Sequence, residues 1–236
     1  MDNYLKNDII KQEIGVGSKG IVYEDGEYAR KLIKDTNAYN KENTCQLRIA
    51  RILSSAVRSQ YTLLLEPKTA TRLQYDNNNI IQILCKGQTL FDTIIAKQII
   101  PGIVLKTAIS ILNILVEMHP KIIHGDIHIG NIMLCNSSIK LIDFGECKFN
   151  LIISPTDLRN DMQSLSVALQ IINEIDDIKN KKLNDDIIQK VNNTDAKNAL
   201  EYILQITQKT ILPTINPYKV FIMGGKRRSL HRGQSK

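Results

Sequence analysis

The amino-acid sequence predicts an α+β fold in which a strand-rich first part precedes a mostly helical second part. Three observations lead to this prediction. Residues 21–33 read as two strands around an Asp25-Gly26 turn, which is typical of a β-hairpin. Residues 105–118, and the chain from Ile178 onward, carry apolar side chains at helical spacing. Between these helical regions, two brief apolar segments joined by Asn136-Ser137-Ser138 predict a second hairpin.

Length and composition indicate an ordinary globular protein. The chain has 236 residues, of which 43% are hydrophobic and 23% are charged, and this length suffices for one sizeable core or two small lobes. No apolar run is as long as a membrane span, so we expect no membrane partner. The first residues lack the charged-then-apolar pattern of a secretory signal, so we expect an intracellular protein, cytoplasmic or nuclear.

Four cysteines are spread along the chain without a CxxC pair. They are Cys45, Cys85, Cys135 and Cys147, each within an apolar or amphipathic segment. Wide spacing of this kind favours buried thiols over disulfides or a zinc site.

The first hairpin contains a glycine-rich string, Ile14 to Tyr23, with the pattern G-x-G-x-x-G. In a dinucleotide-binding fold this pattern opens a helix, whereas here a strand follows it. Gly15, Gly17 and Gly20 would let backbone amides approach phosphate oxygens without side-chain clash. The alternative is a surface turn without a ligand.

The segment from Ile122 to Gly145 carries three oxygen-bearing side chains within apolar surroundings. Asp126 and Asp143 each stand where a strand gives way to a loop, and Asn131 lies between them. Phosphoryl transfer uses this set of groups, because a carboxylate and an amide oxygen hold Mg²⁺ while a separate carboxylate positions the attacking hydroxyl. The alternative for either part alone is a polar hairpin with an Asx turn.

This segment resembles the catalytic loop H-x-D-x-x-x-x-N, followed by D-F-G, of the protein-kinase-like phosphotransferases. The resemblance implies that Asp126 is the catalytic base and that Asn131 and Asp143 are Mg²⁺ ligands. It further implies two lobes, an antiparallel-sheet N-lobe over residues 1–84 and a trimmed helical C-lobe over 85–223. The composition adds a basic tail over residues 224–236. The same resemblance makes Gly15, Gly17, Gly20 and Val22 part of the ATP site.

Lys31 resembles the lysine of the family's V-A-I-K strand, which binds ATP phosphates and pairs with a glutamate on the next helix. In strand geometry Ala29, Lys31 and Ile33 share one face. Glu42 and Gln46 compete for the partner position on the following helix, which we expect to run from about residue 35 toward Val57. Glu42 has the required charge, and Gln46 suits the family's apolar pattern better.

Residues 81–95 are similar to the family's hinge and the short helix after it. This alignment makes Gln82 the gatekeeper, and it lets the backbones of Ile83 and Cys85 contact adenine within an apolar surround. We further expect strands at residues 62–65 and 80–84.

The loop departs from the common kinase pattern at two positions. Gly125 replaces the arginine that receives a phosphorylated activation loop, so activity should not depend on such phosphorylation. His128 brings the string closer to small atypical kinases such as the RIO and KEOPS-complex kinases, and to aminoglycoside and choline phosphotransferases. It would either donate a hydrogen bond to the γ-phosphate or hydrogen-bond the loop. His124 resembles the family's structural histidine. Asp161 resembles the aspartate that accepts hydrogen bonds from the loop backbone, with a helix N-cap as the alternative.

Positive charge is concentrated at the end of the chain. The net charge is +7, and five basic residues with no acidic one follow Gly225, which leaves +2 for the rest. Residues 226–236 predict a mobile tail that contacts nucleic acid or another polyanion without sequence preference; merely solubilising charge is the alternative.

Taken together, the sequence predicts an ATP- and Mg²⁺-dependent kinase that phosphorylates serine or threonine of a protein substrate, with a reduced activation segment lacking A-P-E. The alternatives are a small-molecule phosphotransferase of the aminoglycoside or choline kinase type and a non-catalytic ATP-binding scaffold. Richness in Ile, Asn and Lys resembles the style of proteins from large DNA viruses.

Overall fold

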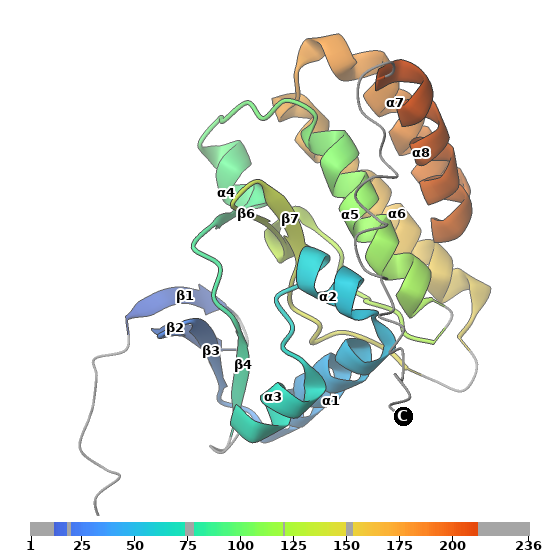
Figure 1. Cartoon of the computed structure of the whole chain (residues 1–236). Helices are drawn as coiled ribbons and strands as arrows, with labels where there is room; N and C mark the ends of the chain where they lie inside the picture. Colours follow the sequence, from blue (N-terminus) through green and yellow to red (C-terminus); the bar gives the residue numbers. More distant parts are fainter. Residues whose placement is uncertain (1–11, 18–19, 74–77, 120, 150–152, 212–236) are drawn as a thin grey trace, which may run out of the picture. The chain divides into compact units, whose positions relative to one another are not determined.

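A four-stranded antiparallel sheet begins the chain in the computed structural model, which describes residues 12–17, 20–73, 78–119, 121–149 and 153–211. Its order is β1 (Glu13–Gly17), β2 (Gly20–Asp25), β3 (Tyr28–Ile33) and β4 (Asn79–Ile83), as Figure 1 shows. Strands β2 and β3 form the hairpin predicted around Asp25-Gly26, and Gly26 has the positive φ of 65° that its turn requires.

Three helices lie between β3 and β4. Helix α1 (Thr36–Ile52) begins at Asp35, whose side chain accepts a 2.7 Å hydrogen bond from the Ala38 amide. Helix α2 (Ser55–Tyr61) is capped by Ser54, and α3 (Pro67–Leu73) follows. The single helix expected toward Val57 is therefore two helices, because the chain turns extended at Leu53 and a new N-cap follows.

The strand predicted at residues 62–65 is wrong. Only Thr62 forms an isolated parallel bridge, to Leu141, and its hydroxyl donates to the Arg58 carbonyl at the end of α2. The apolar run that suggested a strand instead lies buried, without regular secondary structure, between α2 and α3.

A three-stranded sheet contains the second predicted hairpin. Its order is β5 (Gln88–Thr89), β6 (Ile132–Cys135) and β7 (Ser138–Leu141), all antiparallel. Asn136 and Ser137 make the tight turn with φ values of 46° and 70°. Helix α4 (Leu90–Ile95) follows β5, with a capping box between Thr89 and Asp92.

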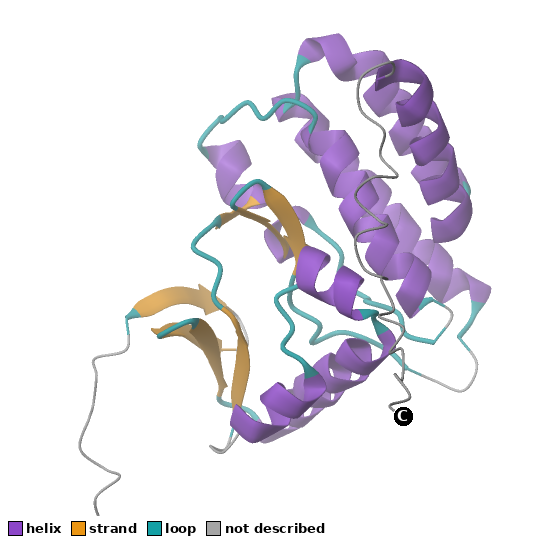
Figure 2. Ribbon diagram, in the orientation of Figure 1, coloured by secondary structure: helices purple, strands orange, loops and turns teal. Residues whose placement is uncertain are grey.

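The remaining helices form most of the second half of the chain (Figure 2). They are α5 (Ile103–Met118), α6 (Pro155–Ile172), α7 (Lys181–Asn193) and α8 (Ala196–Ile211). Short 3-10 helices occur at Ile129–Asn131, Asn173–Ile175 and Ile178–Asn180. Helix α5 packs against α6, α7, α2 and β7, and ten of its residues are buried, so it forms the centre of this core. Residues up to Ile203 make one compact unit, and a second begins at Leu204.

The prediction of free thiols is wrong, because all four cysteines form disulfides. Cys45 bonds Cys147, and Cys85 bonds Cys135, with Cα atoms 6.1 Å and 5.8 Å apart. The partners are separated by 102 and 50 residues, so no local pattern signals either pair. The predicted burial is confirmed for Cys45, Cys135 and Cys147, whereas Cys85 is half-buried.

The predicted α+β class is confirmed, as an antiparallel sheet followed mostly by helices. In the described part of the chain, no helix combines the length and apolar character needed to cross a membrane. The basic tail over residues 224–236 lies outside the described residues.

Candidate active site

The open end of the β6–β7 hairpin brings Asn131 and Asp143 close together. Ile132 pairs with Leu141 as the last ladder pair, and the Ile142 amide donates a 2.9 Å hydrogen bond to the Asn131 carbonyl. The two predicted metal ligands therefore flank one hydrogen-bonded hairpin end, although twelve residues separate them in sequence.

Asn131 also fixes the aspartate five residues earlier in the sequence. Its Nδ2 donates to the Asp126 carbonyl at 2.9 Å and to Asp126 Oδ2 at 3.1 Å. With the amide nitrogen bound to Asp126, Oδ1 lies on the other branch of the amide, the orientation in which an oxygen can face a cation. The Nδ2 atom of Asn131 therefore holds Asp126, and its Oδ1 atom is the one that could bind a cation.

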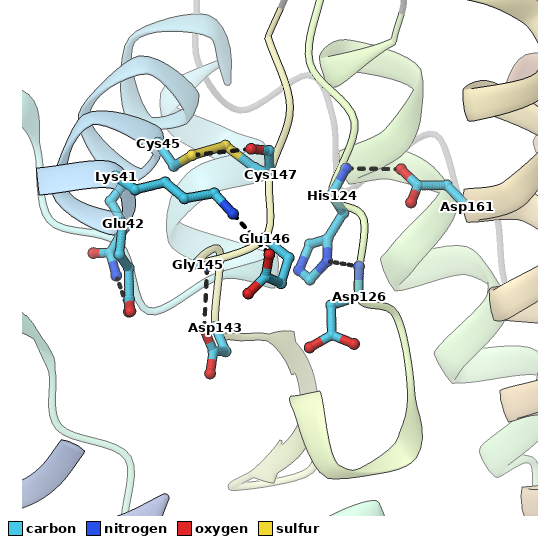
Figure 3. Close-up of a disulfide and its surroundings, with 11 residues drawn as sticks. Lys41, Glu42, Cys45, His124, Asp126, Asp143, Gly145, Glu146, Cys147 and Asp161 are labelled. Atoms are coloured by element: carbon cyan, nitrogen blue, oxygen red, sulfur yellow. Dashed lines mark hydrogen bonds and ion pairs between the residues drawn. A yellow bond between two sulfur atoms is a disulfide. The ribbon is translucent and has the colours of Figure 1, made fainter. Parts of the chain in front are cut away.

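Asp143 has a backbone conformation that few non-glycine residues adopt. Its φ is 54°, and its Oδ1 accepts a 3.1 Å hydrogen bond from the Gly145 amide (Figure 3). Left-handed backbone costs free energy for an L-residue, least for Asp and Asn, and is concentrated at functional sites. This strained turn directs the carboxylate toward β3, where Lys31 Nζ lies 3.4 Å from Asp143 Oδ2.

Lys31 makes its closer contact with helix α1. Its Nζ lies 2.8 Å and 2.9 Å from the two oxygens of Glu42, which is 1% exposed. Gln46 is buried one turn later, and its Nε2 donates a 3.3 Å hydrogen bond to Glu42 Oε1. The two competing residues thus act together: Glu42 pairs with the lysine, and Gln46 supports Glu42.

Asp161 holds the backbone of the loop that carries Asp126. From inside α6, its carboxylate accepts hydrogen bonds from the amides of His124 at 2.8 Å and Gly125 at 2.9 Å. His119 Nε2 lies 3.2 Å from the same carboxylate. The expected backbone contact is therefore present, whereas the N-cap alternative is wrong because Ser154 caps this helix.

His124 is fully buried and packs on Phe144. The two ring centroids are 5.0 Å apart, and His124 Nδ1 accepts a 3.2 Å hydrogen bond from the Asp126 amide. Burial lowers the pKa of His124 despite the opposing charges of Asp161, Asp143 and Asp126. The neutral imidazole is consequently a brace for the loop, as the sequence suggested.

Gly125 is required by geometry. Its φ is 81°, and a Cβ at this position would lie 2.7 Å from the Glu146 carbonyl oxygen. A side chain here would meet both backbone strain and backbone atoms. The absence of the arginine expected from the common kinase pattern thus has a local steric reason.

His128 contacts both the loop and Asp126. Its Nδ1 accepts a 3.1 Å hydrogen bond from the Gly130 amide, which assigns the proton of the neutral ring to Nε2. That Nε2 lies 3.6 Å from Asp126 Oδ2, and the side chain is 53% exposed. The ring therefore braces the loop while presenting a donor beside the carboxylate.

The glycine-rich residues occupy β1 and β2. Gly15 and Gly17 are in β1, and Gly20 and Val22 are in β2. A Cβ on Gly20 would collide with the Leu32 carbonyl, so close approach of β3 already requires this glycine. Residues between Gly17 and Gly20 lie outside the described residues.

At the predicted hinge, the Ile83 amide donates to the Leu63 carbonyl at 2.9 Å. The Ile83 amide is thus already bonded, and the predicted contact with adenine would use the Ile83 carbonyl instead. Cys85 is held by its disulfide to Cys135.

The donor set around Asn131 and Asp143 fits Mg²⁺. One carboxylate and one amide oxygen, completed by phosphate oxygens and water, are typical of Mg²⁺ bound together with a nucleotide. Among the described positions, no group of three or more His, Cys, Asp or Glu side chains is placed to hold a metal.

Three contacts between α1 and the chain after Gly145 were not predicted from the sequence. Lys41 Nζ lies 2.7 Å from Glu146 Oε2, Cys45 bonds Cys147, and the Arg48 guanidinium lies 3.8 Å from the Phe149 ring centroid. The spacing of 41, 45 and 48 marks one helical face, but nothing in the sequence indicates what that face contacts. Figure 3 shows the first two contacts beside Glu42 and Asp143.

No protein-family model matches this chain, and the comparison with curated protein sequences gave no match. The assignment of a function therefore depends on the residues themselves.

Because His124 is buried as the neutral ring, we expect acid to destabilise the protein. The unfolded histidine titrates near its ordinary pKa of 6.5 and the folded one lower, so below pH 6.5 the unfolded state binds more protons. As the pH falls from about 7.5 to 5.5, the free energy of unfolding should therefore decrease, because protons bind His124 preferentially in the unfolded state. Denaturant unfolding measures this change, and His124→Gln should lose that share of the slope. An unchanged slope in the variant would contradict the assignment.

We expect Gly125→Ala to destabilise the protein by about 2 kcal/mol or more, because left-handed backbone and overpacking both oppose the new methyl group. Gly26→Ala is the matched control, since Gly26 has a φ of 65° and no atom within 4 Å of the added Cβ. It should cost only the conformational part, about 1 kcal/mol. Equal losses in chemical denaturation would show that the Glu146 carbonyl is not a constraint.

Proposed function

We propose that this protein is an ATP-dependent phosphotransferase that transfers the γ-phosphoryl group to a serine or threonine hydroxyl of a protein. One observation supports this most strongly. Two motifs 112 residues apart meet, with Lys31 Nζ bound to Glu42 and 3.4 Å from Asp143. A lysine held between two carboxylates, one of them the strained Asp143, fits a site for polyphosphate and metal.

Lys31 would bind phosphate oxygens from its position on β3. Glu42 holds the Lys31 ammonium in place before the nucleotide binds, so binding costs less side-chain entropy. Asn131 Oδ1 and Asp143 would hold Mg²⁺, which neutralises charge on the phosphates during transfer. Gly15, Gly17, Gly20 and Val22 would lie along the phosphates, with adenine against the Ile83 and Cys85 backbones.

Asp126 is the group we assign to the acceptor hydroxyl. Its Oδ2 accepts a hydrogen bond from Asn131 Nδ2, which fixes the carboxylate, and the other oxygen is on the branch that would take the hydroxyl proton. His128 Nε2, 3.6 Å from Oδ2, adds a second donor at this carboxylate or a contact to the transferred group. Deprotonation by Asp126 makes the hydroxyl oxygen a better nucleophile toward phosphorus.

A small-molecule phosphotransferase is the second candidate, and a hollow next to the loop is compatible with it. The hollow has a volume of about 350 Å³ and lies between Ile127–Ile129 and residues of α6, including Asn160, Gln163 and Val167. Such a volume suits a small alcohol as well as a short peptide side chain. Labelled ATP with a panel of protein and aminoalcohol acceptors separates the two; product only on aminoalcohols would replace the protein kinase proposal.

We expect Asp126→Asn to reduce the rate of phosphoryl transfer by about a hundredfold or more while nucleotide binding persists. The amide retains the shape of the carboxylate but cannot take the proton. Transfer of labelled phosphate measures the first effect, and fluorescent-nucleotide titration with Mg²⁺ measures the second. Transfer at the wild-type rate would remove Asp126 as the base.

We further expect Glu42→Gln to reduce kcat by about tenfold to a hundredfold, because the lysine loses its charged partner. Glu66→Gln is the matched control. Glu66 pairs with Arg58, but its side chain is 69% exposed and far less buried than Glu42, so activity should hold. Equal rates in the two variants would contradict the role of the Lys31–Glu42 pair.

A further inference from the structure

One face of α1 is joined to the chain that follows Gly145. Lys41, Cys45 and Arg48 recur at i, i+4 and i+7, so they share a face of the helix. Their partners, Glu146, Cys147 and Phe149, follow one another closely along the chain. This face, residues 41, 45 and 48, is hereafter the docking face of α1.

The three contacts of the docking face differ in strength. The Lys41–Glu146 pair is 48% and 42% exposed, so salt screens it and solvent competes for it. The Arg48–Phe149 contact is a single cation–π interaction of modest energy. Only the disulfide is covalent, and both of its cysteines are buried, with 0% and 3% exposure. The disulfide therefore sets how far α1 can move from the segment after Gly145.

Both ends of this disulfide lie close to proposed catalytic groups. Cys45 is one turn after Glu42 on α1, and Cys147 comes four residues after Asp143. The chain beyond Cys147 is also tied to the loop, because Lys148 and Ile123 exchange backbone hydrogen bonds of 2.9 Å and 3.0 Å. Opening the bond would remove the covalent one of the three contacts on this face of α1, the helix whose Glu42 carboxylate binds Lys31.

We propose that the Cys45–Cys147 disulfide is a positioning bond for phosphoryl transfer: it holds Glu42 against Lys31, next to Asp143, and the oxidised chain is the more active one. This inference rests on the proposed function. In this role Cys45 and Cys147 act on transfer through the position of Glu42, without touching the nucleotide themselves.

The redox step is a thiol–disulfide exchange. Formation of the bond takes two thiols, releases two protons and passes two electrons to a disulfide oxidant such as oxidised glutathione, which leaves as two thiols. A dithiol reductant reverses the exchange. Because Cys45 and Cys147 are buried and Cys85 is half-buried, limited dithiol should open Cys85–Cys135 before Cys45–Cys147. Alkylation of the freed thiols followed by peptide mass analysis identifies which bond has opened.

The first experiment compares full-length variants. Cys45→Ser combined with Cys147→Ser removes the positioning bond, whereas Lys41→Ala removes only the exposed ion pair of the docking face. We expect the double variant to lose about tenfold or more in kcat, with KM for ATP changed less than about threefold, because misplaced catalytic groups slow transfer more than binding. Lys41→Ala should retain the wild-type kcat within about twofold, because an exposed ion pair contributes little. Equal kcat in the double variant and wild type overturns the proposal.

The second experiment uses wild-type protein and does not depend on a variant that folds. Under progressive dithiol treatment, kcat at saturating ATP should fall in proportion to the fraction of Cys45–Cys147 that mass analysis finds open. Retained kcat after complete reduction, or global unfolding on opening the bond, overturns a positioning role.

Hydrogen exchange provides a readout without catalysis. Opening Cys45–Cys147 should increase exchange in the α1 peptide around Glu42 and leave α5 unchanged. If wild type neither binds nucleotide nor transfers phosphate, the proposed function fails. Unchanged α1 exchange overturns the positioning bond by itself. The two failures are thus distinguishable.

Discussion

The buried ion pair between Lys31 and Glu42 is the interaction on which the site depends. Glu42 is 1% exposed and the Lys31 side chain 14%, so each charge has lost most of its hydration. A buried pair of this kind adds little net stability, but removing one partner leaves an unpaired charge that costs about 3–5 kcal/mol. The pair therefore couples the position of α1 to that of β3 and makes intermediate positions unfavourable.

Asp161 plays a comparable part for the catalytic loop. Its carboxylate binds two consecutive backbone amides from inside a helix, and a buried charged acceptor of this kind is worth more than a neutral one. The loop also carries Gly125 with φ of 81°, while the neighbouring turn carries Asp143 with φ of 54°. Glycine adopts this conformation readily, whereas the backbone of Asp143 is strained and persists only when its surroundings overdetermine it. Asp161, the neutral His124 and the β6–β7 hairpin together supply that constraint.

The hairpins and the α5 helix could be predicted from local patterns, because alternation, turn residues and helical spacing are encoded over a few residues. The order of Lys31, Asp126, Asn131 and Asp143 indicated which side chains would gather. Two classes of feature could not be predicted. The break at Leu53 and Ser54 depends on a cap that competes with a continuous helix, and the disulfide partners are brought together only by tertiary packing. For the same reason the docking face of α1 had no sequence signal.

The disulfides clarify how strained and charged elements can coexist here. Closing a loop of 102 residues removes freedom from the unfolded chain worth about 4–5 kcal/mol in the entropic description. That gain is comparable to the cost of one unpaired buried charge. One end of this disulfide, Cys45, lies in α1, the helix that carries Glu42. The covalent bond and the ion pair thus hold the same element by different means: the bond limits the distance that α1 can travel, and within that distance the ion pair selects one position.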